Sequence, residues 1–450
     1  MAHRSTTRSF RETLQYTEQW FNRLILGGYW ALGLPQQIRD NMRWYWFDGL
    51  FAAASDNVYA TYLTVYLVTL GATKVQIGLM SSLSSLAAAA MLIPGALLAE
   101  RVGGRRKEIT ALTGGGISRL MFLLLAAAPL IFGPSAVIWA CIVMAVTREG
   151  FGHLGFPGWV AMTGDIVPPE GRGRYFGSRF FVMGVATMAT ALIFGALITA
   201  AGQPLGYEIA FAAAFLISAV STYCFIRVHD PAADQPKRTQ PPLALRGLWA
   251  SMRQHPAFVI LLITTAIWNF ALFTAGPFFT VYLVENLKAT AAMVGITSAA
   301  QQLTTLLLQR WWGDLTDRWG PRRVQMLSML TIPIVPLLWT LAGAAWHIIG
   351  VNMVAGALWS GYTLASFSFL LHLAPETERA RYSALYQLTV TLASAGGAAF
   401  GSLLITMVSF KGVFVASAVG RMIAALLFVR LLRDHHIDER EMPAEQVTGG

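Results

Sequence analysis

The chain has 450 residues, of which 55% are hydrophobic and 12% are charged, against roughly 25% charged residues in ordinary soluble domains. The formal net charge of +10 comes from arginines and lysines between apolar runs, so membrane topology explains it better than nucleic-acid binding does. Cys141 and Cys224 fall inside apolar runs, which argues against a disulfide framework or a zinc site. The composition therefore indicates a membrane protein.

The N-terminal segment, residues 1–43, precedes the first long apolar run. Residues 9–34 are expected to form an amphipathic helix on the membrane surface, and a partly ordered tail is the alternative. The residues expected to face lipid are Trp20, Phe21, Leu24 and Leu26. The apolar stretch 24–34 is short, is interrupted by glycines and lacks a small-residue cleavage pattern. We therefore expect no signal peptide.

Twelve apolar runs follow, each near the ~20 residues that cross a bilayer as a helix. Backbone groups in lipid must be satisfied within their own segment, so the runs predict an all-α polytopic membrane protein. The first six spans are expected at 44–70, 75–98, 109–132, 136–163, 176–201 and 207–228. The second six are expected at 257–285, 291–311, 324–344, 347–373, 383–408 and 412–433.

The loops between these spans alternate in charge. One set carries most of the arginines, and the other set is very short and holds little beyond Lys74, Lys288 and Lys411. The positive-inside rule makes the arginine-rich set cytoplasmic, with both termini on that side of the cytoplasmic (inner) membrane. Residues 229–256 form the linker between two bundles, 44–228 and 257–433, and residues 434–450 form a cytoplasmic tail.

A charged turn occurs twice, and it marks the chain as duplicated. The turn at Asp317-Arg318 repeats the turn at Glu100-Arg101, 217 residues earlier. Two further pairs of segments recur in the same order, 64–68 with 280–284 and 168–175 with 375–382. Two parallel six-helix repeats imply a pseudo-two-fold axis along the membrane normal and a central site about which the halves rock.

At these turns the chain resembles the major facilitator superfamily, whose signature between helices 2 and 3 is G-x-x-x-D-R-x-G-[RK]-[RK]. The second copy fits the signature except that Pro321 stands at the first basic position. The first copy departs at three positions: Ala96 replaces the glycine, Glu100 replaces the aspartate and Gly104 replaces the first basic residue. The resemblance implies transport by alternating access and a cytoplasmic gate at these turns; the alternative is that their charges only fix topology. The gate residues are Glu100, Arg101, Gly103, Arg172, Gly313, Asp317, Arg318, Gly320 and Arg379.

Ionisable residues inside a bilayer are costly and are candidates for function. Asp56 and Arg148 lie at similar depth in the first and fourth spans, and in the resembling fold both helices line the central cavity. A carboxylate beside an arginine can exchange a proton as the cavity opens; a permanent ion pair is the alternative. The candidate coupling and cavity residues are Asp56, Asn57, Arg119, Arg148, Glu149 and His153.

Two of these candidates have open alternatives. Arg119 is expected either to bind an anionic group of a substrate or to pair with Glu149. His153 lies one turn from Glu149 and is expected to be a hydrogen-bonded packing residue rather than a coupling group.

In the C-terminal half the expected mid-membrane residues are polar or aromatic but uncharged. Amides orient substrates and rings stack on flat or cationic molecules, although most such residues only pack helices. The candidate substrate residues are Trp268, Asn269, Gln301, Gln302, Trp359 and Tyr362.

These patterns predict a monomeric secondary transporter for a small organic solute or amphiphile, coupled to protons through its central charges, with uptake and efflux both open. A non-transporting scaffold, sensor or assembly factor and a lipid flippase are the alternatives. We find no phosphate loop and no metal-ligand spacing. The expected partners are therefore a small-molecule substrate, protons and membrane lipids. We expect no cofactor, nucleic acid, metal or enzymatic activity.

Overall fold

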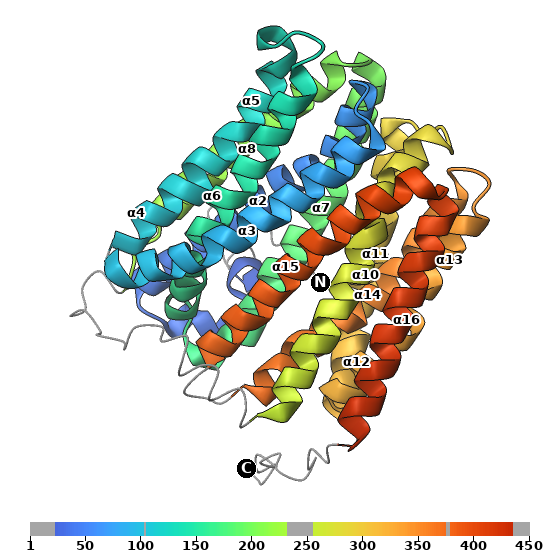
Figure 1. Cartoon of the computed structure of the whole chain (residues 1–450). Helices are drawn as coiled ribbons and strands as arrows, with labels where there is room; N and C mark the ends of the chain where they lie inside the picture. Colours follow the sequence, from blue (N-terminus) through green and yellow to red (C-terminus); the bar gives the residue numbers. More distant parts are fainter. Residues whose placement is uncertain (1–22, 103–104, 232–254, 375–378, 435–450) are drawn as a thin grey trace, which may run out of the picture.

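The computed structural model describes residues 23–102, 105–231, 255–374 and 379–434, and these residues are helical apart from turns and connectors (Figure 1). The N-terminal half contains α2 (Gln36–Thr69), α3 (Lys74–Val102), α4 (Arg106–Thr110) with η3 (Ala111–Ile117) and α5 (Ser118–Ile131), α6 (Val137–Ile166), η4 (Pro169–Gly171), α7 (Arg172–Ala201) and α8 (Leu205–Arg227). The C-terminal half contains α10 (Pro256–Glu285), α11 (Ala291–Trp319), α12 (Pro321–Thr331) with α13 (Ile334–Leu341), α14 (His347–Leu373), α15 (Arg379–Met407) and α16 (Phe410–Asp434).

The helices confirm the predicted all-α membrane fold of twelve spans in two bundles. Eleven stretches of the described chain are long and apolar enough to cross a membrane. The twelfth span is α2, whose middle carries Asp48, Asp56 and Asn57 and is therefore less apolar. The helix begins at Gln36, eight residues before the predicted start at 44.

The two halves meet along two pairs of helices. Within the N-terminal half, α3 packs on α6 and α2 packs on α7 and α8; within the C-terminal half, α10 packs on α15 and α16, and α11 packs on α14. Between the halves, α3 packs on α15 and α7 packs on α11 (Figure 1). We call the end with the turns near residues 101, 171 and 320 the arginine-rich end, and the opposite end the short-loop end.

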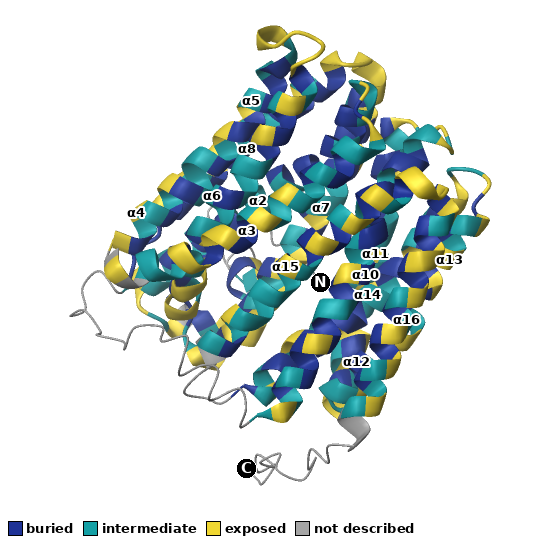
Figure 2. Cartoon of the chain, in the orientation of Figure 1, coloured by how far each residue is buried: buried dark blue, intermediate teal, exposed yellow. Residues whose placement is uncertain are grey.

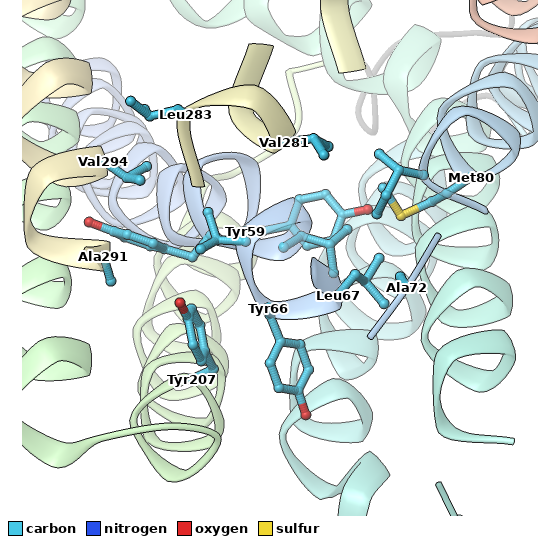
Figure 3. Close-up of a cluster of buried hydrophobic side chains, with 14 of the residues drawn as sticks. Tyr59, Tyr66, Leu67, Ala72, Met80, Tyr207, Val281, Leu283, Ala291 and Val294 are labelled. Carbon is cyan, nitrogen blue, oxygen red and sulfur yellow. The ribbon is translucent and has the colours of Figure 1, made fainter. Parts of the chain in front are cut away.

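The buried apolar core distinguishes these two ends. At the short-loop end one cluster joins both halves, and Figure 3 shows Tyr59, Met80 and Tyr207 beside Val281 and Val294. At the arginine-rich end the halves have separate clusters, one around Met42 and Tyr175 and another around Phe258 and Tyr382. The halves therefore share a core only toward the short-loop end.

Close backbone contacts hold the halves together there. A Cβ atom at Gly295 of α11 would overlap the carbonyl oxygen of Ala191 in α7, so only glycine permits this approach. Ser82 Oγ donates to Ala395 O at 2.9 Å, and Ala292 N donates to Thr199 Oγ1 at 3.0 Å. Both hydrogen bonds cross from one half to the other.

Figure 2 shows exposed residues along the helices, and many of the exposed residues are large and apolar. Leu130, Leu341 and Met407 each expose about four-fifths of their surface. Such a surface would be unfavourable in water, but it is suited to lipid. The exposed faces therefore agree with a multi-pass membrane protein.

The N-terminal segment corrects one prediction. Residues 23–26 are helical and a 3-10 helix follows at Tyr29–Gly33, whereas residues 1–22, with Trp20 and Phe21, lie outside the described residues. Leu26, predicted to face lipid, is fully buried in the protein beside Met42 and Tyr175, whereas Leu24 is 42% exposed. The prediction for Leu26 is wrong because this stretch packs on the arginine-rich end of its own half.

The start of the predicted linker is also fixed to that half. The Asn41 side chain accepts from His229 N and donates to His229 O, at 2.8 and 3.0 Å. Arg106 of α4 binds the buried carboxylate of Asp230 and the carboxylate of Asp165 at the end of α6, with shortest distances of 2.7 and 2.6 Å. The linker residues 232–254 and the tail 435–450 lie outside the described residues.

Candidate transport site

A trio of charged side chains lies near the middle of the N-terminal half. Arg148 Nη2 of α6 donates to Asp56 Oδ1 of α2 at 2.6 Å, and Nη1 donates to Glu149 Oε1 at 2.5 Å. Counted from the short-loop end, Asp56 and Arg148 lie 13 and 11 residues inside their helices, or about 20 and 17 Å at 1.5 Å per residue. The trio is therefore near the midplane of a ~30 Å hydrocarbon core.

The arginine of this trio is held by surrounding groups. Its guanidinium lies over the rings of Tyr59 and Phe122, 4.0 and 5.1 Å from their centroids, a cation–π arrangement. Ser118 Oγ of α5 donates to the backbone oxygen of Arg148 at 3.0 Å. Arg148 exposes 14% of its side chain, whereas Asp56 exposes 49%. The cation is thus enclosed, and its carboxylate partner is open on one side.

The trio has an unbalanced formal charge. Two ionised carboxylates and one guanidinium sum to −1, and one added proton makes the group neutral. A net charge within a membrane is costly. With both carboxylates ionised, the trio is therefore not a neutral ion pair.

The other predicted members of the coupling site contact their surroundings differently. His153 Nδ1 lies 3.0 Å from Glu149 O of its own helix, as expected for a packing residue, and 3.8 Å from Glu149 Oε2. Asn57 donates to Thr187 O and Thr190 Oγ1 of α7. Of the two alternatives for Arg119, the pair with Glu149 does not form, because Arg119 Nη1 donates instead to Ser218 O and Thr222 Oγ1 of α8.

The aromatic candidates of the C-terminal half form one cluster. The rings of Trp268 and Tyr362 stack at 5.3 Å with an interplanar angle of 24°, and Trp359 meets the Tyr362 ring edge-on at 5.3 Å. Trp268 and Tyr362 are buried, whereas Trp359 is partly exposed. In this conformation only Trp359 of the three is partly accessible.

The amide candidates divide in the same way. Asn269 is buried and donates to Thr265 O within its own helix, at 2.9 Å. Gln301 and Gln302 are partly exposed, and Gln302 faces Gly184 of α7, where a Cβ would lie 2.9 Å from its Nε2 atom. Gln302 therefore lies at the boundary between the halves.

Three of the predicted gate residues are exposed at the arginine-rich end. Arg101, Asp317 and Arg318 are exposed and form no ion pair with the described residues. Arg172 caps the end of α6 through Val167 O and Gly164 O, at 3.0 and 2.5 Å. Gly313 lies within α11, and Gly320 follows that helix with a φ of 81°. Gly103 and the side chains of Glu100 and Arg379 lie outside the described residues.

The sequence analysis missed two buried charge sites. Asp48 of α2 and Arg179 of α7 lie 3.5 Å apart, and both are almost fully buried. They were overlooked because the expected spans began at 44 and 176, which placed both residues near the span ends. Asp48 also accepts from Ser221 Oγ of α8 at 2.7 Å, and Arg179 Nε donates to Tyr45 O at 3.1 Å.

The second missed site is Arg421, which corrects the expectation of an uncharged C-terminal half. It lies 11 residues inside α16 and is 1% exposed. Its Nε donates to Ser417 Oγ at 3.1 Å, while Nη2 is buried without a hydrogen-bond partner, and no described carboxylate pairs with it. The same rule that selected Asp56, an ionisable residue inside an apolar run, would have found it.

The chain is similar to known membrane transporters in sequence and in fold. The efflux pump PmrA of Streptococcus pneumoniae is 22% identical over 85% of this chain and 93% of its own length. The multidrug resistance protein MdtG of Serratia proteamaculans is 23% identical over 83% of this chain and 89% of its own length. The fold is similar to the crystal structure of the nucleoside transporter NupG, with a TM-score of 0.67, 14% identity and coverage of 89% of this chain and 100% of that one.

A second solved structure is similar to the same extent. A POT family transporter crystallised with 5-aminolevulinic acid has a TM-score of 0.67 at 14% identity, over 92% of this chain and 99% of that one. The family model described as Major Facilitator Superfamily matches residues 46–282 and 261–447, so it covers both halves of the duplicated chain. The chain is therefore a member of the Major Facilitator Superfamily of membrane transporters.

Proposed function

We propose that this protein is a proton-coupled secondary transporter that exports small amphiphilic organic compounds across the cytoplasmic membrane. The observation that carries the proposal is the trio of Asp56, Arg148 and Glu149. A half-exposed carboxylate at mid-membrane depth has no packing role that requires exposure. It is placed to meet both a proton and a solute.

The position of α2 supports a shared central site. This helix packs on α7 and α8 of its own half and also touches α10 and α11 of the other half. The exposed side of Asp56, together with the exposed Ala60 one turn away, then faces the space between the halves. Trp359 and Gln302 face this space from the C-terminal half in our proposal.

The difference between the two ends supports alternating access. The shared core and the hydrogen bond between Ala292 and Thr199 close the short-loop end, and the bond from Ser82 to Ala395 O joins the halves deeper in the spans. The separate cores at the other end leave the halves free to part there. With the arginine-rich loops in the cytoplasm, this is an inward-facing conformation, and rocking of the halves exposes the trio to the opposite side.

The direction and the substrate class are supported by the relatives. PmrA and MdtG are named for multidrug efflux and multidrug resistance. A partly exposed indole and amides suit flat or cationic amphiphiles, because aromatic faces attract both. A proton entering at Asp56 from the short-loop side would drive such a compound outward.

The test uses purified protein in liposomes with an acidic lumen and a panel of fluorescent amphiphilic dyes. We expect accumulation of at least one dye in the lumen, driven by the pH gradient and abolished by a proton ionophore. Liposomes without protein provide the background. If no dye moves with or without a gradient while the protein remains folded, a non-transporting scaffold becomes the better account.

A further inference from the structure

Three lysines from the short loops converge on one cleft of about 710 Å³ at the short-loop end. They are Lys74 at the start of α3, Lys288 between α10 and α11, and Lys411 at the start of α16. The other loops at this end, 132–136, 201–205 and 342–347, contain no lysine or arginine. The positive-inside rule disfavours cations in these loops, so their concentration at one place needs an explanation.

The cleft lies across the boundary between the halves. Lys74 belongs to the N-terminal half, but its Nζ atom lies 4.3 Å from the ring centroid of Phe410 in the C-terminal half. Lys288 and Lys411 belong to the C-terminal half and are exposed. A ligand that bound all three amino groups would therefore connect the two halves.

The lysines are not neutralised by their own carboxylate. Glu285 also lines the cleft, but no described lysine–carboxylate pair there lies within ion-pair distance. The four charges sum formally to +2. Lys288 has a φ of 53°, a left-handed conformation uncommon for a residue with a Cβ atom. Local strain of this kind is often kept at functional positions.

We propose that this cleft binds an anion bearing carboxylate or phosphate groups and that the bound anion stabilises the conformation closed at the short-loop end. Ammonium groups on flexible stems attract such anions as point charges, without the fixed geometry of a guanidinium. A volume of about 710 Å³ falls in the range of small-molecule pockets. Because the ligand contacts both halves only when they are together, binding shifts the population toward the closed state.

The binding test measures thermal shifts of the purified full chain, titrated with inorganic phosphate or with citrate at constant ionic strength. We expect a saturable rise in melting temperature. Combining Lys74→Gln with Lys411→Gln should weaken the apparent affinity at least tenfold, since each substitution removes one attractive charge. Glu285→Gln should tighten it severalfold, because it removes the repulsive charge.

The matched control is Lys107→Gln, a lysine at the arginine-rich end that lies 3.4 Å from Ile226 O. The Lys107→Gln variant should bind phosphate and citrate with the same affinity as the parent chain. The proposal is overturned if neither anion gives a saturable shift, or if the lysine variants bind as the parent does. Opposite signs for the lysine and Glu285 variants cannot arise from a general loss of stability.

Two sources can supply this chemistry, a free anion or the phosphate of a lipid headgroup. Nanodiscs of phosphatidylglycerol and of phosphatidylcholine separate them. A free-anion site gives the same phosphate affinity in both. A headgroup site gives a higher melting temperature in phosphatidylglycerol, lost in the lysine variants, with phosphate competing. If neither the phosphate titrations nor the comparison of the two lipids shows binding, the proposed site does not exist.

The bridging role has its own measurement and rests on the proposed alternating access. Cysteines at Thr199 and Ala292, whose parent residues share a 3.0 Å hydrogen bond between the halves, report closure through their rate of disulfide formation. The anion should raise this rate in the chain with three lysines and leave it unchanged with Lys74→Gln. If the anion binds but does not change the rate of disulfide formation, the proposed connection between the halves is overturned and the binding site is kept. If the protein proves not to be proton-coupled, the binding result is unaffected.

Discussion

The two halves arise from one repeated unit but treat buried charge in opposite ways. In the N-terminal half Arg148 pairs with two carboxylates, Arg179 pairs with Asp48, and Arg119 reaches oxygen atoms of α8. In the C-terminal half Arg421 has one hydrogen bond to Ser417 and no described carboxylate. The N-terminal half thus carries buried arginines paired with carboxylates, whereas the C-terminal half carries aromatic rings and, among its described residues, a buried arginine without a carboxylate.

In the proposed function this difference gives the two halves separate tasks. A carboxylate next to an arginine can change its protonation with little change in packing, which suits coupling. A cluster of aromatic rings has no such states, which suits recognition of an apolar solute. Duplication therefore preserved the helices and the charged turns while the interiors diverged. The following substitutions test this contrast, from the largest expected effect to the smallest.

The largest effect is expected for Asp48→Ala. The substitution leaves the Arg179 guanidinium buried without its carboxylate, and breaking a buried pair costs about 3–5 kcal/mol. Thermal unfolding in detergent should show a large fall in melting temperature. Asp40→Ala is the control, since Asp40 pairs with Arg43 at the surface, where such pairs contribute about 0–1 kcal/mol. Equal effects of the two variants would contradict the pairing in the N-terminal half.

Arg421→Met should have the opposite sign. Replacing buried charged groups by apolar ones of similar volume often stabilises a protein by about 1–4 kcal/mol, and Arg421 lacks even a charged partner. The lost bond to Ser417 offsets about 1 kcal/mol of this gain. We expect a higher melting temperature in the same assay. A clear decrease in melting temperature would mean that a bound group pairs with the Arg421 guanidinium. The two halves would then differ less in how they treat buried charge.

Gly295→Val tests whether the halves must touch closely at the short-loop end. A side chain there would overlap Ala191 O, and overpacking of this kind costs about 1–3 kcal/mol. The closed state should become less populated by about tenfold. Labelling of a cysteine introduced at Ser82 would then be faster than in the parent. Gly343→Val is the control, because a Cβ atom at Gly343 has no neighbour within 4 Å.

The smallest effect is expected for Trp359→Ala. This ring is the exposed member of the aromatic cluster, and an aromatic contact contributes about 0.5–1.5 kcal/mol. The KM for an aromatic amphiphile should rise about 2- to 12-fold, with a smaller change for an aliphatic one. Trp139→Ala is the control, since Trp139 is 49% exposed on the N-terminal half. Equal changes for both substrates would remove Trp359 from the solute site.

The positions of the helices could be predicted from the sequence because each span is a long apolar run. The start of α2 could not, since residues 36–43 are mostly polar and continue the helix beyond the apolar run. Interruptions within spans also escaped prediction. The break between α12 and α13 falls at Pro333, a residue without a backbone N–H, but periodicity alone does not tell a break from a kink.

The sequence predicted how deep in the membrane the candidate residues lie, but not the direction in which their side chains point. Depth along the helices and the family resemblance brought Asp56 and Arg148 together. The partner of Arg119 depended on the rotation of its helix, which turns this side chain toward α8. Leu26 was misplaced because burial against another element has the same apolar signature as burial in lipid.

The most direct test of the central claim compares two transport modes of Asp56→Asn in liposomes. In counterflow, solute exchanges without a pH gradient; in gradient-driven transport, accumulation requires proton movement. We predict that the variant retains counterflow and loses accumulation, while Asp40→Asn retains both. Accumulation at the parent level in Asp56→Asn would contradict the role of the mid-membrane trio in coupling.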